Sequence, residues 1–527
     1  MEQKGDGHGR RHLLALGVDV LRCIAYYLDV TALARLERTC TFLATFARQQ
    51  GWSALAGRTR RRYVLQGSAP LHVKEALRID WAWETRTFLP SQLPFPPPPS
   101  TPPPAGRHMA RQTHQEKHAG AMVPFSMLLL VPHGLVLVLR SELRYWSKDQ
   151  LEKDDALSME ASQLVNLANP AGLDPHWARR RGRARSRDGL PASSALWDLS
   201  ACAQLDLAGH YLALGRSNGL VEIVSLTYVE EEQRLLVDLQ WMYTEVLDKA
   251  GIQAMHACPH SGLLAAISKT GQAWLFSTKE LGATGQCHAL ASWTVEGRPW
   301  SVFVGGAGGD NGGVPWLAIG TARHGIVVYA LDKERRPSLR KSVCCLDSHG
   351  AAVYALQGAA RDGQGTFLDA QGPSTLFAGC YDGRVRQFHI HDAWQGQTKP
   401  THTFRDRFDP SAIYCLCPGV GQGGGHLAAG TARHGAVKVF DAAASSEHTR
   451  APPREAQGWS MFAAHPSHSP TYSLAGQHDR LFGVTERKMW QVDLRRGRGH
   501  GGGEPSTLAF YRHADMLLDA SRPPSCP

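Results

Sequence analysis

The stretch WLAIGTARHGIVVYAL, Trp316 to Leu331, has the pattern of a β-hairpin. Trp316 to Ile319 is short and apolar, Gly320 to Gly325 supplies a bend, and Ile326 to Tyr329 is β-branched and aromatic, which fits a pleated, half-buried surface. The stretch LAAGTARHGAVKVF, Leu427 to Phe440, repeats this hairpin, and the six residues GTARHG are identical in both copies. A recurring hairpin predicts a repeat architecture.

Four weaker copies of the hairpin keep nearly the same spacing. A small residue closes the first strand of each copy, and successive positions are 53, 52, 59, 51 and 53 residues apart: Gly215, Ser268, Gly320, Gly379, Gly430 and Gly483. A tight hairpin needs φ > 0 near its tip, which Gly adopts without steric cost. The tip glycines are Gly219, Gly271, Gly325, Gly383 and Gly435, whereas the sixth copy has Glu486-Arg487 at its bend.

A further strand precedes each of the later hairpins. The segments PWSVFV from Pro299, VYALQ from Val353, IYCLC from Ile413 and TYSLA from Thr471 each place an aromatic residue two positions before an apolar one. Period-2 alternation puts both on one sheet face. Each unit therefore holds at least three strands in about 50 residues, enough for a four-stranded blade of a closed ring.

These units predict a mainly β fold, a seven-bladed β-propeller over residues 123–513. The first blade comes from MLLLVPHGLVLVLRSELRYW, Met127 to Trp146, and Thr507 to His513 is a candidate for one more strand that closes the ring. Residues 149–195 are predicted to be a basic insertion within the ring. Residues 1–12 and 514–527 are predicted to be disordered tails.

Residues 56–122 are predicted to be a linker, because Pro94 to Pro104, PFPPPPSTPPP, excludes a packed core. Within the basic insertion, six of the nine residues from Arg179 to Arg187 are arginine. This run fits a nuclear-localisation patch, a nucleic-acid contact or a solvated loop, and the last is favoured. No aromatic residue interleaves with it, so nucleic-acid binding is poorly supported.

Composition and motifs exclude several classes of function. The 527 residues carry a net charge of +10 and 43% hydrophobic residues, with no apolar run long enough to span a bilayer. The 11 cysteines form no C-x-x-C pair, so we expect reduced thiols and no zinc. The histidines His108, His114, His118 and the segment HIHD, His389 to Asp392, fit polar surface positions better than a metal site. No catalytic motif is present, so no enzyme activity, metal or cofactor is expected.

The N-terminal segment has the pattern of a small helical unit. Asp19 is a candidate cap for a helix with Val20, Ile24 and Leu28 on one face, and Thr31 is a candidate cap for a second. Residues 13–55 are long enough for three helices with a small core. Units of this size often gain stability from a partner.

The segment Leu13 to Trp52 resembles an F-box. It matches that motif at its acidic position, its apolar helix residues and its late tryptophan: Leu16, Asp19, Val20, Leu21, Ile24, Leu28, Asp29, Leu33, Leu36, Cys40, Phe42, Leu43 and Trp52. Gly17 stands where the motif usually has proline. With the predicted ring, the chain resembles the F-box/WD-repeat family of SCF ubiquitin-ligase substrate receptors, most of all its dactylin branch. The likeness covers residues 13–52 and most of 123–494, although the blades lack the usual Trp-Asp ending.

The resemblance implies a non-catalytic adaptor found in the cytoplasm, the nucleus or both. Its F-box would bind a Skp-type adaptor, and through it a cullin and a RING subunit, by Leu16, Val20, Leu21, Ile24, Leu28, Leu33, Leu36, Phe42 and Leu43. Its propeller would hold a protein substrate for ubiquitination. Arg323, Arg384 and Arg433 at the hairpin bends are candidates for substrate binding, although solvated turn residues are the favoured interpretation. The alternative is a propeller scaffold without a ubiquitin-ligase role, in nuclear or RNA-associated assemblies.

Overall fold

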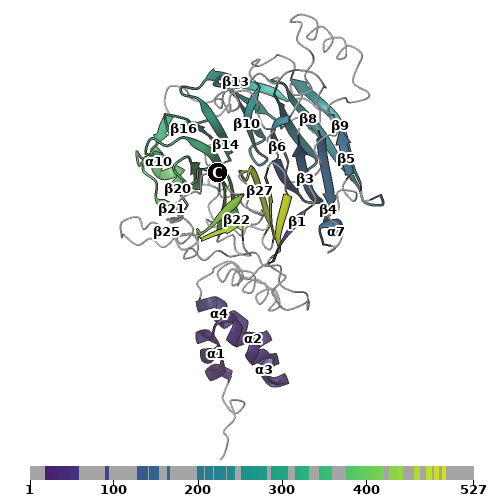
Figure 1. Cartoon of the computed structure of the whole chain (residues 1–527), viewed down its shortest axis with the longest axis vertical. Helices are drawn as coiled ribbons and strands as arrows, with labels where there is room; N and C mark the ends of the chain where they lie inside the picture. Colours follow the sequence, from purple (N-terminus) through teal and green to yellow (C-terminus); the bar gives the residue numbers. More distant parts are fainter. Residues whose placement is uncertain are drawn as a thin grey trace, which may run out of the picture.

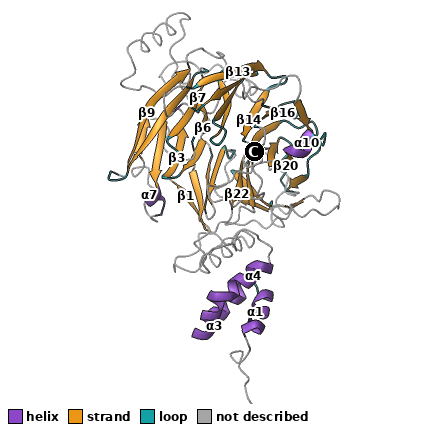
Figure 2. Cartoon of the chain, turned by 180° about the vertical axis from the view of Figure 1, so that it is seen from behind, coloured by secondary structure: helices purple, strands orange, loops and turns teal. Residues whose placement is uncertain are grey.

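The computed structural model has a mainly β chain whose strands form seven separate sheets. Each sheet is one blade of a ring, as Figure 1 and the opposite view in Figure 2 show. The structure describes residues 18–58, 89–93, 127–139, 142–152, 163–166, 199–206, 208–217, 219–232, 234–243, 251–279, 281, 287–306, 315–331, 343–358, 375–406, 409–420, 426–433, 435–442, 456–457, 459–462, 470–477, 480–485 and 489–493.

The first four blades each contain four antiparallel strands in sequence order. Blade 1 contains β2 (Met127–Val131), β3 (Gly134–Leu139), β4 (Glu142–Ser147) and β5 (Gln163–Asn166). Blade 2 contains β6 (Leu199–Gln204), β7 (Tyr211–Arg216), β8 (Val221–Val229) and β9 (Arg234–Tyr243). Blade 3 contains β10 (Ile252–Cys258), β11 (Leu263–Ser268), β12 (Gln272–Ser277) and β13 (His288–Thr294). Blade 4 contains β14 (Pro299–Gly305), β15 (Trp316–Thr321), β16 (Ile326–Ala330) and β17 (Val343–Leu346).

Blades 5 and 7 each contain one strand from elsewhere in the chain, whereas blade 6 is interrupted only by the strand that joins blade 5. Blade 5 contains β18 (Val353–Gly358), β19 (Thr375–Cys380), β20 (Arg384–His389), β21 (His402–Arg405) and β25 (Ala456–Gln457). Blade 6 contains β22 (Ile413–Val420), β23 (His426–Thr431), β24 (Ala436–Asp441) and β26 (Trp459–Phe462). Blade 7 contains β27 (Ser473–Gln477), β28 (Arg480–Val484), β29 (Met489–Asp493) and β1 (Leu89–Leu93).

The first strand of each blade, its inner strand, contacts the inner strand of the next blade around the ring: β2, β6, β10, β14, β18, β22 and β27. The ring closes because β27 of blade 7 contacts β2 of blade 1. Two hydrogen bonds join these blades, from Leu128 N to Ser473 Oγ at 3.1 Å and from Arg480 Nη1 to Leu151 O at 2.9 Å. The predicted seven-bladed propeller is therefore confirmed.

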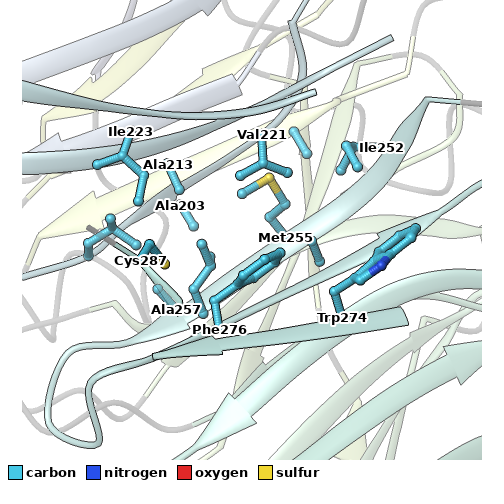
Figure 3. Close-up of a cluster of buried hydrophobic side chains, with 14 of the residues drawn as sticks. Ala203, Ala213, Val221, Ile223, Ile252, Met255, Ala257, Trp274, Phe276 and Cys287 are labelled. Carbon is cyan, nitrogen blue, oxygen red and sulfur yellow. The ribbon is translucent and has the colours of Figure 1, made fainter. Parts of the chain in front are cut away.

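The hydrophobic core lies between the blades. Each of the seven interfaces has its own cluster of buried apolar side chains, and the cluster between blades 7 and 1 includes Phe482 and Trp146. Figure 3 shows the cluster between blades 2 and 3, where Ile223 and Ala213 face Phe276 and Ala257. Because the ring is closed, both faces of every sheet are covered.

Four recurring small residues are glycines at blade interfaces. A Cβ on Gly320 of β15 would come within 2.7 Å of Val353 Cγ1 on the next inner strand. Equivalent contacts arise at Gly215, Gly379 and Gly430, against Ile252, Ile413 and Thr471. The close approach of adjacent blades therefore explains the repeated glycine.

In blade 3 the predicted position of the recurring small residue, Ser268, lies one residue too late in the chain. Ile267 faces Ala254 of its inner strand, as Gly320 faces Ser301, so Ile267 holds the equivalent place. The spacing located the hairpin of blade 3 correctly, although not this position.

The turn glycines have the predicted backbone conformation. Their φ angles are positive, at 85°, 103°, 69°, 76° and 58° for Gly219, Gly271, Gly325, Gly383 and Gly435. The expected bend at Glu486-Arg487 lies outside the described residues.

The strand β1 corrects the predicted linker over residues 56–122. Residues Leu89–Leu93 form the outer strand of blade 7, antiparallel to β29, with Leu89 opposite Asp493 and Leu93 opposite Met489. Only the ring supplies the free edge of β29 that β1 covers. The other candidate for a closing strand, Thr507 to His513, lies outside the described residues.

Two further segments differ from expectation. Residues 149–195 include most of a short helix, α7 (Lys148–Glu152), and the outer strand of blade 1, since β5 pairs with β4. The segment HIHD is not a continuous strand: β20 ends at His389, and a short helix, α10 (Ile390–Trp394), follows.

The N-terminal unit contains four short α-helices and a π-helical turn, where three helices were expected. They are α1 (Val18–Tyr27), α2 (Val30–Glu37), α3 (Thr41–Phe46), η2 (Ala47–Gly51) and α4 (Trp52–Arg58). We call residues 18–58 the helical unit; Figure 1 shows it outside the ring. The cap of α2 is Asp29 rather than Thr31, because Asp29 Oδ1 accepts from Ala32 N at 2.6 Å. None of the helices in the described ranges is long and apolar enough to cross a membrane.

Candidate functional site

The nine residues expected to bind an adaptor lie at different depths in the helical unit. Leu21, Leu33 and Leu43 are buried in its core. Ile24, Leu28 and Leu36 are half-buried against that core. Val20 and Phe42 are 47% and 43% exposed, whereas Leu16 lies outside the described residues. Of the described residues, Val20 and Phe42 are thus the most accessible for direct contact, and the three core leucines support the unit from within.

Three exposed apolar residues of the helical unit were not predicted. Val18, Tyr26 and Tyr27 are on α1, and Tyr27 is 77% exposed. The rings of Tyr26 and Tyr27 meet edge to face with centroids 5.3 Å apart. Sequence periodicity assigned the apolar face of α1 to Val20, Ile24 and Leu28, but the fully buried residues of α1 are Leu21 and Ala25.

A buried polar network holds the helical unit together. The carboxylate of Glu37 is almost fully buried, and it accepts from Arg48 Nε at 3.1 Å and from Trp52 Nε1 at 3.3 Å. This network ties α2 to η2 and to the start of α4. Hydrogen bonds to a buried charged group contribute more than those between neutral groups, about 1.5–3 kcal/mol each.

A second accessible region lies at one end of the ring. We call the end that carries the GTARHG turns and the start of each inner strand the turn face. At this end, five inner strands contain a β-bulge, at Ser200, Gln253, Trp300, Tyr354 and Tyr414. A bulge interrupts strict alternation and re-aims the side chain it carries. The aromatic residues of these strands therefore do not follow the alternation expected from the sequence.

The bulges of blades 4, 5 and 6 bring four aromatic rings together. The centroid of Tyr354 lies 5.1 Å from Trp300, 5.2 Å from Tyr414 and 5.9 Å from Tyr381. All three pairs meet at 74° to 87°, the favourable edge-to-face geometry. We call these four residues the aromatic cluster. Tyr381 is 63% exposed, and the other three are half-buried.

Basic side chains adjoin the aromatic cluster. The guanidinium carbon of Arg298, which is exposed, lies 4.5 Å from the ring centroid of Trp300. Burial, together with the charge of Arg298, holds the pKa of Lys269 below its usual range. Burial is also the main cause that raises the pKa of Tyr354 and Tyr414, so their hydroxyl groups stay protonated and can donate hydrogen bonds.

Buried charged side chains hold blades 5 and 6, which carry the three tyrosines of the aromatic cluster, in place. Arg386 is fully buried and donates from Nη1 and Nη2 to the carboxylate of Asp382, at 3.1 and 2.6 Å. Lys438 of blade 6 donates to Ser411 O at 3.4 Å and to Gly383 O of blade 5 at 3.5 Å. Burial lowers the pKa of Lys438. These contacts fix the turn that carries Tyr381.

The three arginines expected to bind substrate do not occupy equivalent positions. Arg323 and Arg433 are exposed in the turns after β15 and β23. Arg384 is the first residue of β20, is less exposed, and lies 3.9 Å from the carboxylate of Asp382. The turn of blade 5 has the same length, since Gly379 faces Val385 as Gly320 faces Ile326, but Asp382 holds the place of Arg323 and Arg384 follows two residues later. All three lie on the turn face, and their role in substrate binding stays a prediction.

No metal site emerges from the described residues: no group of three His, Cys, Asp or Glu side chains there is arranged to hold an ion. The described cysteines are free. Burial raises the pKa of Cys417 to about 12, so this thiol is not a nucleophile at neutral pH.

Comparison with known proteins gives no family model and no curated protein that matches the chain. Similar solved structures include Sqt1 of Chaetomium thermophilum bound to the N-terminus of a ribosomal protein, at 15% identity over 70% of this chain and 83% of that chain, with a TM-score of 0.46. The RRP9 WD40 repeats are 10% identical over 71% and 95%, with a TM-score of 0.46. U3-55K is 10% identical over 71% and 96%, with a TM-score of 0.45. Likeness at this level carries no argument about function, so the propeller rests on its own strand topology.

Proposed function

We propose that this chain is a non-catalytic adaptor that binds one protein through the helical unit and another through the turn face of the propeller. One observation carries the proposal. Five of the nine exposed large apolar side chains of the described residues belong to the helical unit: Val18, Val20, Tyr26, Tyr27 and Phe42. Apolar side chains gathered on one small unit mark an interaction site.

The finer proposal is that the chain is the substrate-recognition subunit of an SCF-type cullin-RING ubiquitin ligase. Its resemblance to an F-box identifies the partner of the helical unit as a Skp-type adaptor. The exposure of Val20 and Phe42, two of the residues assigned to that contact, supports this assignment. The chain would then act by proximity, holding a substrate lysine close to the ubiquitin thioester and so raising its effective concentration.

Co-purification of a Skp-type adaptor with the full chain tests this proposal. The double variant Val20→Asp plus Phe42→Asp places charges on exposed positions, so the helical unit should still fold while adaptor recovery falls by about tenfold or more. Trp394→Asp, at an exposed apolar residue of the propeller, is the matched control and should not change recovery. Equal recovery with the double variant and the wild type would exclude the SCF role.

A second candidate is a propeller scaffold without a ubiquitin-ligase role, in a nuclear or RNA-associated assembly. The net charge of +10 and the arginines between Arg179 and Arg187 favour it. RNA crosslinking of the full chain and of a variant lacking residues 179–187 tests this candidate. Crosslinking that disappears with the arginine run, combined with no adaptor recovery, would favour the scaffold. Crosslinking that persists would remove the arginine run as its basis.

A further inference from the structure

We infer that the aromatic cluster, together with Arg298 and Lys269, binds an extended acidic peptide segment of the partner protein, one that carries an apolar side chain between carboxylates and needs no phosphate. The inference rests on the proposed adaptor function and names the class of segment that the turn face holds. It is carried by the shape of the aromatic cluster, by the charges beside it and by the rigidity of the blades that support it.

The aromatic cluster offers an apolar surface with walls. The three rings that surround Tyr354 stand nearly perpendicular to it, so they form sides rather than one flat stack. Tyr381 is the most exposed of them and stands at the edge of the half-buried rings. A leucine, proline or aromatic side chain would cover these rings, and the tyrosine hydroxyls would donate hydrogen bonds to the peptide backbone or its carboxylates.

The charges beside the cluster select an acidic peptide over a basic one. Arg298 already lies over Trp300 and, within the described residues, makes no ion pair with a carboxylate. Burial is the main cause that lowers the pKa of Lys269, and repulsion from the charge of Arg298 adds to it. A ligand cation would add to this repulsion, whereas a carboxylate would relieve it. The carboxylate of Asp382, the residue after Tyr381, is paired with the guanidinium of Arg386.

The site is also preorganised. The inner-strand bulges fix Trp300, Tyr354 and Tyr414 on three adjacent blades, and Lys438 joins the blade 5 turn to blade 6. A rigid site loses little conformational entropy on binding. The net charge of +10 over the whole chain adds long-range attraction for acidic partners. The side chains of the site therefore do not have to become ordered before the peptide binds.

Fluorescence anisotropy of the full chain with labelled peptides tests the inference. The probe is the unphosphorylated peptide GEDEWPLEDEG, and its charge-reversed counterpart is GKRKWPLKRKG. The acidic peptide should bind about tenfold more tightly or better than the basic one, and added salt should weaken it. Equal or tighter binding of the basic peptide would overturn the inference. Binding that appears only after a phosphate is added to the peptide would overturn it in favour of a phosphate reader.

Two variants at exposed positions locate the site. Arg298→Glu and Tyr381→Ala should each weaken the acidic peptide by about tenfold, since central aromatic and arginine contacts dominate small interfaces. The controls are Arg234→Glu and Trp394→Ala, which make the same kinds of change. Both residues come after the end of the third strand of their blade, at the end of the ring opposite the turn face. Tyr354→Phe, which retains the ring, should weaken binding less than Tyr381→Ala. If the controls weaken binding as much as the two variants, the site is not on the turn face.

The two proposals fail separately. Adaptor recovery depends on the helical unit, whereas peptide binding depends on the turn face. A chain that recovers the adaptor but ignores the acidic peptide would overturn only this inference. A chain that binds the peptide through Arg298 and Tyr381 but recovers no adaptor would overturn only the SCF role.

Discussion

The propeller and the helical unit differ in how completely they bury their apolar side chains. Each of the seven blades packs its apolar residues against a neighbour, and the ring leaves no blade without one. The helical unit has one small core and leaves five large apolar side chains exposed. The difference arises because the ring is closed, so that every blade is covered by two neighbours, whereas a unit of about 40 residues cannot bury all of its apolar surface. The helical unit therefore needs a partner more than the ring does.

Removal of β1 should cause the largest loss in the free energy of unfolding, because it uncovers the edge of β29. Deletion of residues 1–93 removes the outer strand of blade 7 and its pairing with β29. We expect a loss of about 5 kcal/mol, at about 1 kcal/mol for each lost hydrogen bond, measured by denaturant unfolding of the propeller. Deletion of residues 1–60, which removes the helical unit but keeps β1, is the control and should leave the unfolding midpoint of the ring unchanged. A similar midpoint for both deletions would contradict the role of β1.

The substitution Gly320→Val tests the close approach of the blades. Its Cβ would come within 2.7 Å of Val353 Cγ1, so the interface of blades 4 and 5 must move apart, at a cost of about 3 kcal/mol in unfolding free energy. Gly350→Ala is the control, because a Cβ there meets nothing within 4 Å, and its positive φ should cost only about 1 kcal/mol. A loss for Gly320→Val no larger than that for Gly350→Ala would contradict the role of blade contact at Gly320.

The helical unit should be sensitive to Glu37, since it has so little other core. Glu37→Leu removes the buried acceptor of Trp52 Nε1 and should cost about 2–3 kcal/mol, read from the loss of helical circular dichroism on heating. Glu37→Gln retains an acceptor oxygen and should cost less. The melting of the propeller should not change in either variant. A joint loss of helical and propeller signals would show that the two regions unfold together.

Acid should produce the smallest effect, confined to the ring. Burial lowers the pKa of His256 to about 4, and its Nδ1 accepts from Val304 N at 3.1 Å, so the folded state holds this ring neutral. The unfolded histidine takes up a proton as pH falls below about 6.5, which the folded one resists, so stability is lost on acidification. Between pH 7 and pH 5 we expect a loss of about 1–2 kcal/mol. His256→Asn, which keeps an acceptor near Nδ1, should flatten this part of the pH profile; an unchanged profile would assign the loss to other groups.

The repeat in the sequence predicted most of the ring. Hairpin composition and the step between Gly215, Gly320, Gly379 and Gly430 located six blades, because strand chemistry and tight turns are local. The sequence located no outer strand of the repeated units, and the outer strands of blades 1 and 7 fall in segments that were predicted to be an insertion and a linker. The strand β1 lies far in the chain from the rest of blade 7, and β5 is separated from β4 by a break in the strand pattern. An outer strand is defined by the sheet edge that it covers rather than by its own composition.

The binding surfaces were less predictable than the fold. The sequence determined that helices precede a ring of hairpins and that an aromatic residue lies at or next to the start of each later inner strand. Only the tertiary structure decided that β-bulges bring Trp300, Tyr354 and Tyr414 together beside Arg298, and that Leu21 lies inside the helical unit while Tyr27 lies outside it. Local composition selects helix, strand and turn, but exposure and the contact of distant side chains depend on how elements from different parts of the chain pack against one another.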